Sequence, residues 1–201
     1  MGKIALSQHT SLDGVMQSPG HTDVPFKYRG WIMDFDVGPE GERFQLEQAQ
    51  SSEALLLGRV TYEAMQAFWP TAEGEFADRL NELPKYVVSS TLTDPPWNAT
   101  ILGDDWPEEV ARLRKELDGE IVVYGSRRLS RALVGMGLVD ELRLMVYPVL
   151  LGAGDRLFGE TQDKIPMRLV ESRPFGGGVV NVIYAPARFA WEASEDRNEQ
   201  A

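Results

Sequence analysis

The amino-acid sequence predicts an α/β fold with a mostly parallel central sheet, antiparallel C-terminal strands and flanking helices. Two apolar, β-rich runs each meet a glycine and continue directly into a helical pattern, at residues 55–62 and 121–136. Such strand-turn-helix units are typical of a parallel sheet. Two later β-rich runs, 168–175 and 179–185, are joined by consecutive glycines, which is typical of an antiparallel hairpin.

The first part of the chain predicts a strand, a long loop and a helix. Residues 3–7 have the composition of a strand, and the sequence Ser-Leu-Asp-Gly at 11–14 is typical of the loop that leaves it. Residues 19–41 are rich in Gly, Pro, Asp and aromatic residues without clear periodicity, which indicates a long ordered loop over a site. A helix is expected over residues 41–51.

Strands and helices alternate along the middle of the chain. We expect strands at 54–57, 85–89, 100–102 and 121–124, and helices at 61–68, 106–117 and 127–136. Pro70 ends the first of these helices, Asp105 and Pro107 begin the second, and Gly137 lies just beyond the third. A long β-rich run at 140–151 then precedes the hairpin.

Composition and charge exclude several classes of protein. The 201 residues fit one domain at 1–188, followed by an acidic tail at 189–201 that we expect to be disordered. The net charge of −11 opposes binding to nucleic acid, and no apolar stretch reaches the roughly 18 residues of a membrane span. With no cysteine and two histidines, a metal centre is not expected. We expect a cytoplasmic protein.

The turn at Gly58 has the features of an anion site. A helix N-terminus presents unpaired backbone N–H groups and the positive end of the helix dipole, and both favour a phosphate. Gly58 allows a ligand to approach the backbone, Arg59 adds a guanidinium group, and Thr61 offers a hydroxyl. In a chain of net charge −11, an anionic ligand depends on such local positive groups.

A second turn of the same kind extends this site. Gly125 and Ser126 stand between the second strand and its helix, while Ser89, Ser90 and Thr91 end the strand between the two turns. In open α/β sheets, ligands bind beyond the carboxyl ends of the strands, where all of these residues are expected. Hydroxyl and N–H groups suit ribose and phosphate oxygens. The sequence therefore predicts an extended phosphorylated ligand such as a dinucleotide.

Motifs along nearly the whole chain resemble the dihydrofolate reductase-like superfamily. In order, they are SLDG at 11–14, LLLGRVTYEAM at 55–65, YVVSS at 86–90, VVYGS at 122–126 and YPVLLGAGDRLF at 147–158. The closer match is the branch that includes the reductase domain of bacterial riboflavin biosynthesis, and the resemblance covers residues 3–186. It implies a three-layer reductase fold that binds NADPH in an extended pose across the strand ends, in a branch that is commonly dimeric.

The resemblance also implies cofactor contacts at matching positions. It assigns cofactor phosphates to Gly58, Arg59 and Thr61, the adenosine side to Ser89, Ser90 and Thr91, and the pyrophosphate to Gly125, Ser126 and Leu129. It implies that the backbone near His9 and Thr10 meets the nicotinamide carboxamide, and that Val15 and Met16 lie in the loop that covers the ring.

The proton source for a reduction has several candidates, water among them. Dihydrofolate reductases carry a carboxylate on their first helix, and counting back from Gly58 places Glu42 near that position, although the preceding loop differs. Asp13 either faces the substrate or makes an Asx-type turn with Gly14. His9 either donates a proton or is only packed or hydrogen-bonded.

The chain is thus predicted to be an NADPH-dependent oxidoreductase. It would transfer a hydride to a C=N or C=O of a small, heterocyclic, pterin- or pyrimidine-like substrate. Trp31 either walls a pocket for the flat ring or anchors the long loop to the core. The alternative is a module that binds or senses the nucleotide cofactor without turnover.

The predicted partners are a small-molecule substrate and a second copy of the chain. The runs at 142–151 and 179–184 are long and apolar, with few charges to protect a sheet edge. Such surface usually ends in a partner, so we expect a homodimer built on the antiparallel half.

Overall fold

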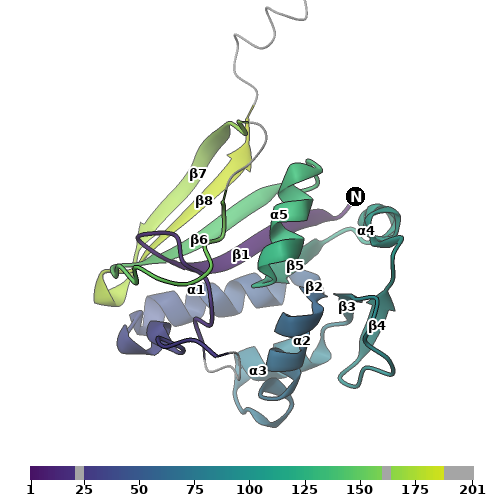
Figure 1. Cartoon of the computed structure of the whole chain (residues 1–201), viewed down its shortest axis with the longest axis horizontal. Coiled ribbons are helices and arrows are strands. Elements are labelled where there is room, and N and C mark those ends of the chain that lie inside the picture. The colour runs from purple at the N-terminus through teal and green to yellow at the C-terminus, as the bar shows by residue number, and fades with distance from the viewer. Residues whose placement is uncertain (21–24, 160–163, 188–201) are drawn as a thin grey trace, which may run out of the picture.

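An eight-stranded sheet in the order β4-β3-β2-β5-β1-β6-β8-β7 forms the centre of the molecule (Figure 1). The structure is a computed structural model that describes residues 1–20, 25–159 and 164–187. Its strands are β1 (Lys3–Ser11), β2 (Ser52–Gly58), β3 (Lys85–Val88), β4 (Ala99–Leu102), β5 (Glu120–Tyr124), β6 (Glu141–Tyr147), β7 (Met167–Pro174) and β8 (Val180–Pro186). Strands β1 to β6 pair in parallel, whereas β8 pairs antiparallel with β6 and β7. The predicted α/β fold is therefore confirmed.

Helices cover both faces of this sheet (Figure 1). They are α1 (Gly38–Ser51), α2 (Arg59–Gln66), α3 (Glu75–Glu82), α4 (Trp106–Glu116) and α5 (Arg127–Gly135), with short 3-10 helices at Trp31–Asp34, Trp69–Thr71 and Gly176–Gly178. On one face, α1 and α3 bury Phe44 and Leu80 against the strands. On the other face, α4 and α5 bury Leu113 and Leu133. Alternating strand residues thus enter separate cores on the two faces.

Helix α3 is absent from the predicted elements. It begins after Gly74 and packs Ala77 and Leu80 into the core, and Leu83, directly after its end, is buried beside them. Since it has only eight residues, its apolar spacing spans about two turns, too few for periodicity to separate it from a loop.

The antiparallel half differs from the prediction at its edge. Strand β6 ends at Tyr147, because Pro148 has no N–H group with which to continue the ladder. β6 lies between β1 and β8, and β8 lies between β6 and β7, so neither apolar strand is an edge. The edge is β7, which carries Arg168, Glu171 and Pro174, residue types that discourage pairing with another chain. The predicted exposed apolar edge is therefore wrong.

Two predicted features fall outside the described residues. The predicted tail at 189–201 lies outside the described residues, as does His21. Within the described ranges, no helix combines the length and the apolar character needed to cross a membrane.

Candidate functional site

The two predicted strand-to-helix turns lie against each other. The Gly58 backbone N–H donates to the Ser126 hydroxyl oxygen at 2.8 Å, and the Ser126 N–H donates to the Thr61 hydroxyl oxygen at 2.9 Å. Because β2 and β5 are neighbours in the sheet, α2 and α5 begin side by side at its carboxyl edge. We call residues 58–61 and 125–128 the paired turns.

The backbone of the second turn is left-handed and tightly packed. Gly125 and Ser126 have φ of +55° and +56°. A Cβ at Gly125 would lie 3.1 Å from Thr61 Cγ2, so glycine permits the close approach of the two turns. The Ser126 hydroxyl also donates to the Tyr124 carbonyl at 3.2 Å. The hydroxyls of Thr61 and Ser126 thus join the turns, which leaves the first backbone N–H groups of both helices for a ligand.

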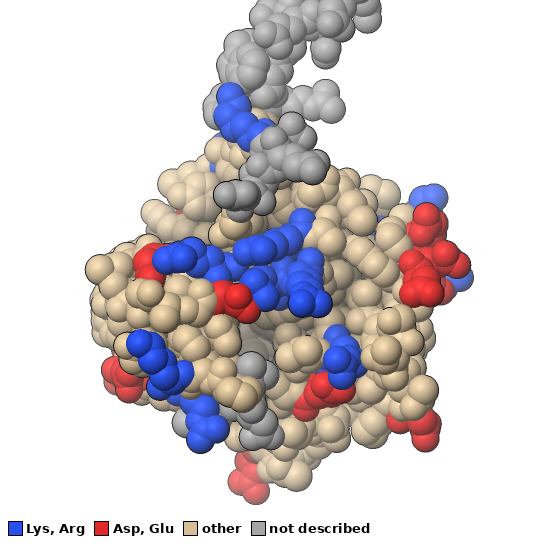
Figure 2. All heavy atoms as spheres, viewed as in Figure 1, with Lys and Arg blue, Asp and Glu red and all other residues tan. Residues whose placement is uncertain are grey.

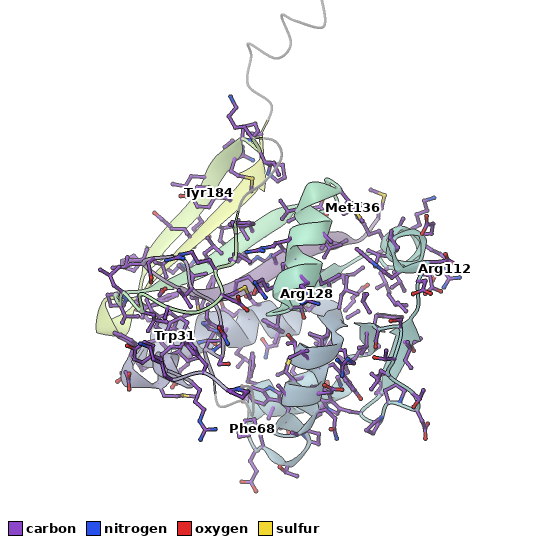
Figure 3. The ribbon with its side chains drawn as sticks, viewed as in Figure 1. Trp31, Phe68, Arg112, Arg128, Met136 and Tyr184 are labelled. Carbon is purple, nitrogen blue, oxygen red and sulfur yellow. The ribbon has the colours of Figure 1, made fainter. Side chains whose placement is uncertain are left out.

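Arginines accompany the paired turns. Arg59 is exposed and pairs with Glu63 at 3.2 Å, and Arg127 pairs with Asp155 at 2.7 Å. Arg128 is exposed at the start of α5 (Figure 3) and makes no hydrogen bond or ion pair with any other described residue. Lys and Arg gather in a band across this face (Figure 2), although the chain carries a net charge of −11. Arg128 is missing from the predicted site, yet an arginine pair directly after Gly-Ser marks a cationic helix start.

The hydroxyl-rich exit of β3 forms a local turn. Ser89 Oγ accepts the backbone N–H groups of Thr91 at 3.2 Å and Leu92 at 3.0 Å. Ser90 and Thr91 are exposed beyond the end of β3, the neighbour of β2 in the sheet. Since neither of their hydroxyls is hydrogen-bonded within the described chain, both are available at the same edge as the paired turns.

His9 on β1 is held by a buried tyrosine of β6. The Tyr147 hydroxyl lies 3.1 Å from His9 Nδ1, and Tyr147 is only 2% exposed. Burial lowers the pKa of His9 to about 4 and raises the pKa of Tyr147 to about 12, so both side chains are neutral near pH 7. Of the two predicted roles of His9, a hydrogen-bonded neutral ring matches this geometry, and an imidazolium proton donor does not.

Asp13 ties the loop after β1 to the loop after β6. Its carboxylate accepts the Ser11 hydroxyl at 2.6 Å, the Leu151 N–H at 3.1 Å and the Gly152 N–H at 3.0 Å. The Ser11 hydroxyl, followed by these backbone groups, lowers the pKa of Asp13. An ionised carboxylate with this many donors anchors the two loops and is poorly suited to donate a proton. The predicted Asx-type turn with Gly14 does not form, because the Gly14 N–H donates to the Ser11 carbonyl instead.

Other residues that the resemblance implies are buried. The side chains of Thr10, Val15, Met16 and Leu129 are 4%, 0%, 6% and 6% exposed. They pack in the core at the carboxyl edge of the sheet, so any contact with a cofactor there falls to the backbone.

The structure does not place Glu42 over the sheet. Glu42 is exposed on α1, whose buried side carries Gly41, Phe44 and Gln48. In the part of the chain that the structure describes, no three His, Cys, Asp or Glu side chains form a group that could hold a metal.

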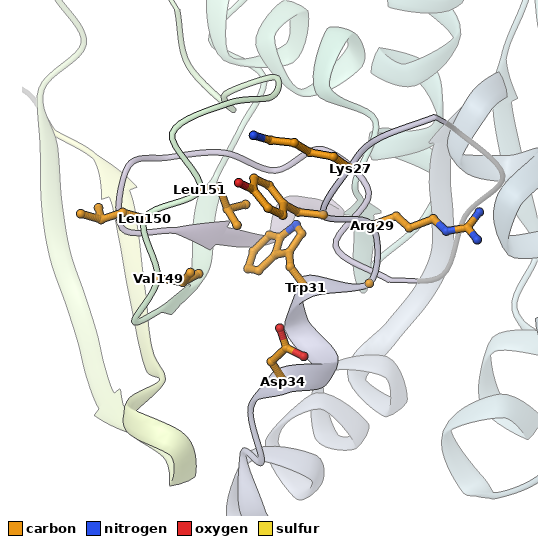
Figure 4. Close-up of a pocket in the computed structure, with 9 residues that line it drawn as sticks. Lys27, Arg29, Trp31, Asp34, Val149, Leu150 and Leu151 are labelled. Atoms are coloured by element: carbon orange, nitrogen blue, oxygen red, sulfur yellow. The ribbon is translucent and has the colours of Figure 1, made fainter.

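A cavity of about 410 Å³ opens between the 27–34 segment and the loop after β6 (Figure 4). It is lined by Lys27, Tyr28, Arg29, Gly30, Trp31, Asp34 and residues 149–151. Its volume is that of a small-molecule site. Trp31 lines this cavity and also packs on Tyr147, at 5.4 Å between ring centroids, so it anchors the 27–34 segment to the core. Asp34, which no sequence motif marks, places a carboxylate at this cavity.

Comparisons with known proteins agree with this fold. A family model of the RibD C-terminal domain matches residues 3–181. The chain is 30% identical over 189 residues to the uncharacterized protein YyaP of Bacillus subtilis (strain 168), covering 90% of this chain and 94% of YyaP. In fold it is similar to a Shewanella sp. PV-4 protein assigned to riboflavin biosynthesis, with a TM-score of 0.71 and 21% identity over 94% of this chain and 100% of that one. Dihydrofolate reductase from Enterococcus faecalis, solved with NADP(H), gives a TM-score of 0.63 and 16% identity over 93% and 98% of the two chains.

Proposed function

Because the chain belongs to the RibD C-terminal domain family, we propose that it is an NADPH-dependent reductase of a small heterocyclic substrate. It would transfer a hydride to a C=N or C=O group of a pterin- or pyrimidine-like ring. The observation that carries this proposal is that the paired turns, each at a helix N-terminus, are joined by the Gly58–Ser126 and Ser126–Thr61 hydrogen bonds. The similarity in fold to an NADP(H) complex of dihydrofolate reductase supports it by analogy.

The residues at the paired turns fit the phosphates of a dinucleotide. Helices α2 and α5 direct unpaired N–H groups and the positive ends of their dipoles to the same edge of the sheet. A side chain at Gly58 would lie 3.5 Å from Ser126 Oγ and fill the gap between the helix starts. Arg128 adds a guanidinium without a partner in the described chain, and Ser90 and Thr91 extend the polar edge by one strand.

The cofactor, when bound, supplies the hydride, while the chain orients the reactants and limits water. The loop after β1 is held in place from several sides. Met16 donates its N–H to the Asp155 carbonyl at 2.9 Å, Arg156 donates to the Asp13 carbonyl at 2.8 Å, and Val15 forms a β-bridge with Arg156. This loop would form a preorganised wall beside the end of β1.

Oxidation of NADPH in the presence of pterins, pyrimidinones and aldehydes tests the reductase. Substrate-dependent oxidation supports the proposal. Tight NADPH binding without oxidation by any compound supports the alternative, a cofactor-binding or sensing module. Failure to bind NADPH at all contradicts both functions.

Replacing Arg128 with alanine is expected to weaken NADPH binding about tenfold to a hundredfold, since a charge-assisted contact contributes about 1.5–3 kcal/mol. Arg59→Ala should act in the same direction and less strongly, because Glu63 already shares that charge. The matched control is Arg112→Ala on α4, whose guanidinium pairs with Glu109 and Glu116 on the surface. Calorimetric titration measures the dissociation constants. An unchanged affinity in folded Arg128→Ala would remove Arg128 from the site.

The site is expected to prefer NADPH over NADH by about tenfold or more, because a 2′-phosphate gains charge-assisted hydrogen bonds. Ser90 and Thr91 offer hydroxyls at the adenosine side, and Arg59 lies at the neighbouring strand end. The preference should shrink at high salt, as expected for exposed charges. Titration of both cofactors at matched ionic strength checks this, and equal affinities would contradict the assignment.

The chain is also proposed to form a homodimer through one face of its antiparallel half. The side chains on this face belong to β6, β8 and β7, and we call them the hairpin face: Leu144, Val146, Leu169, Val180, Val182 and Tyr184. Leu169 is 50% exposed and Val180 is 37% exposed. In Figure 1 the β7–β8 hairpin extends beyond α5, the helix on the same side of the sheet. A surface of this kind suits a second copy of the chain.

Light scattering tests the dimer against the chain mass of 22.5 kDa. We expect about twice this mass at micromolar concentration, and the chain mass alone in Leu169→Glu, which would bury a charge in the interface. Phe68→Glu is the control, since Phe68 is 56% exposed outside the hairpin face (Figure 3). If the native protein has the mass of one chain at micromolar concentration, the dimer proposal is wrong.

A further inference from the structure

His9 lies on the α1 side of the sheet, beside the paired turns. Side chains alternate along a strand, and Ser7, two residues earlier, donates its hydroxyl to Gln48 of α1 at 3.0 Å. In the pairing of β1 with β5, Ser7 lies opposite Tyr124. β5 ends at Tyr124, so His9 lies two residues beyond this pair, at the carboxyl edge of the sheet where the paired turns begin.

The Tyr147 hydroxyl determines which nitrogen of His9 carries the proton. Tyr147 is 2% exposed, and His9 Nδ1 at 3.1 Å is its hydroxyl's sole hydrogen-bond partner in the described chain. A buried hydroxyl needs an acceptor, so Tyr147 donates to Nδ1. The neutral imidazole must then carry its hydrogen on Nε2. Trp31 and Phe35 pack edge-on against Tyr147, with ring centroids at 5.4 and 5.6 Å, which holds this arrangement.

The Nε2–H of His9 is free to donate. His9 is part-exposed, its Nε2 has no partner within the described chain, and it is not among the buried polar atoms without a partner. The ring is neutral at pH 7 because burial disfavours the imidazolium. The charges on the same face do not reverse this, since Arg143 is neutralised by Glu120 and Glu141.

We propose that His9, with its tautomer set by Tyr147, is the neutral hydrogen-bond donor to the group that this enzyme reduces. The inference rests on the proposed reductase function and names the residue that polarises its substrate. When the C=O or C=N carbon accepts the hydride electron pair, the π electrons move to the oxygen or nitrogen. That atom accepts the His9 Nε2–H hydrogen bond, and a proton from water completes the reduction. His9 is then the catalytic residue, and Tyr147 is its positioning residue.

Nitrogen NMR on histidine-labelled protein tests the tautomer without turnover. The chain has two histidines, so the variant His21→Gln leaves His9 as the single signal. We expect the Nε2–H tautomer and no titration between pH 6 and pH 8, and in Tyr147→Phe a mixture of both tautomers. An Nδ1–H tautomer, or an imidazolium at pH 7, would overturn the inference.

Kinetics separate donation from a merely structural role. Removing one donor to a developing anion lowers kcat about 10²–10³-fold, and we expect this for His9→Ala with an NADPH dissociation constant within about twofold of native. His9→Gln, which keeps an N–H donor, should recover part of the rate, and Tyr147→Phe should lower kcat with little change in NADPH affinity. Tyr86→Phe makes the same chemical change on the opposite face of the sheet, where Tyr86 packs against the core under α4, and should leave kcat unchanged.

The failures of the two proposals are distinguishable. No NADPH oxidation with any substrate overturns the reductase function and this inference together. Native-like kcat in a folded His9→Ala, with the reductase activity intact, overturns this inference alone.

Discussion

Gly125→Ala is expected to lower NADPH affinity more than about tenfold and to destabilise the fold by about 2–3 kcal/mol, because the substitution combines left-handed strain with crowding. The backbone φ at Gly125 is +55°, and the new Cβ would lie 3.1 Å from Thr61 Cγ2 and 3.2 Å from Thr61 Oγ1. Thr61 would have to move, and its hydrogen bond from Ser126 would break. Titration with NADPH and denaturant unfolding measure the two effects.

Gly137→Ala separates strain from crowding. Gly137 follows the other end of α5 with a φ of +66°, and a Cβ there meets nothing within 4 Å. This variant should lose about 1 kcal/mol through backbone strain alone and bind NADPH as the native protein does. If both variants bind NADPH equally well, the paired turns are not the phosphate site.

Arg143→Met is expected to destabilise the fold by about 3–5 kcal/mol, because it leaves buried carboxylates without a cationic partner. Arg143 donates to both carboxylate oxygens of Glu120, one of them at 2.7 Å, and to Glu141 at 2.6 Å. The side chains of Arg143 and Glu120 are 11% and 12% exposed. Urea unfolding measures the loss.

Two controls identify the cause of that loss. Arg112→Met removes a surface guanidinium that is 62% exposed and should change stability by less than about 1 kcal/mol. The double variant Arg143→Met/Glu120→Leu removes the unpaired carboxylate of Glu120 and should recover much of the stability. A single variant as stable as the native protein would show that the ion pair contributes nothing.

The fold could be predicted because its signals are local. Each strand-turn-helix unit carries its apolar strand, its glycine and its helical pattern within one short segment, so residues 55–62 and 121–136 predict β2-α2 and β5-α5. The position of both turns at the carboxyl ends of parallel strands was enough to place them at one edge of the sheet. Helix α3 and the edge position of β7 depend on tertiary packing and strand order, which no local pattern carries.

The side-chain pairings of the site could not be predicted, because they join distant parts of the chain. Tyr147 and His9 are separated by 138 positions, and so are Asp13 and Leu151. The sequence offers hydroxyls at Thr61 and Ser126 as ligands, whereas their mutual contact in the fold occupies them. Long-range register, not residue type, decides which polar groups remain free.

The two arginines at the helix N-termini, Arg59 and Arg128, differ in a way that the local sequence does show. The preceding glycine marks Arg59 as the cation of the first turn, but its neighbour one helical turn on is Glu63. An Arg–Glu pair at this spacing is a standard helix-surface contact. Arg128 follows an equally clear turn and has no acidic residue one turn ahead, since that position is Ala132. The residue four positions on therefore distinguishes the two arginines.

A crystal structure with bound NADPH tests the central claim most directly, namely that the paired turns bind the cofactor's phosphates. We predict the pyrophosphate between the first turns of α2 and α5, with Arg128 within hydrogen-bond distance of a phosphate oxygen and the nicotinamide beside His9. Phosphates bound outside the reach of residues 58–61 and 125–128 would contradict the account.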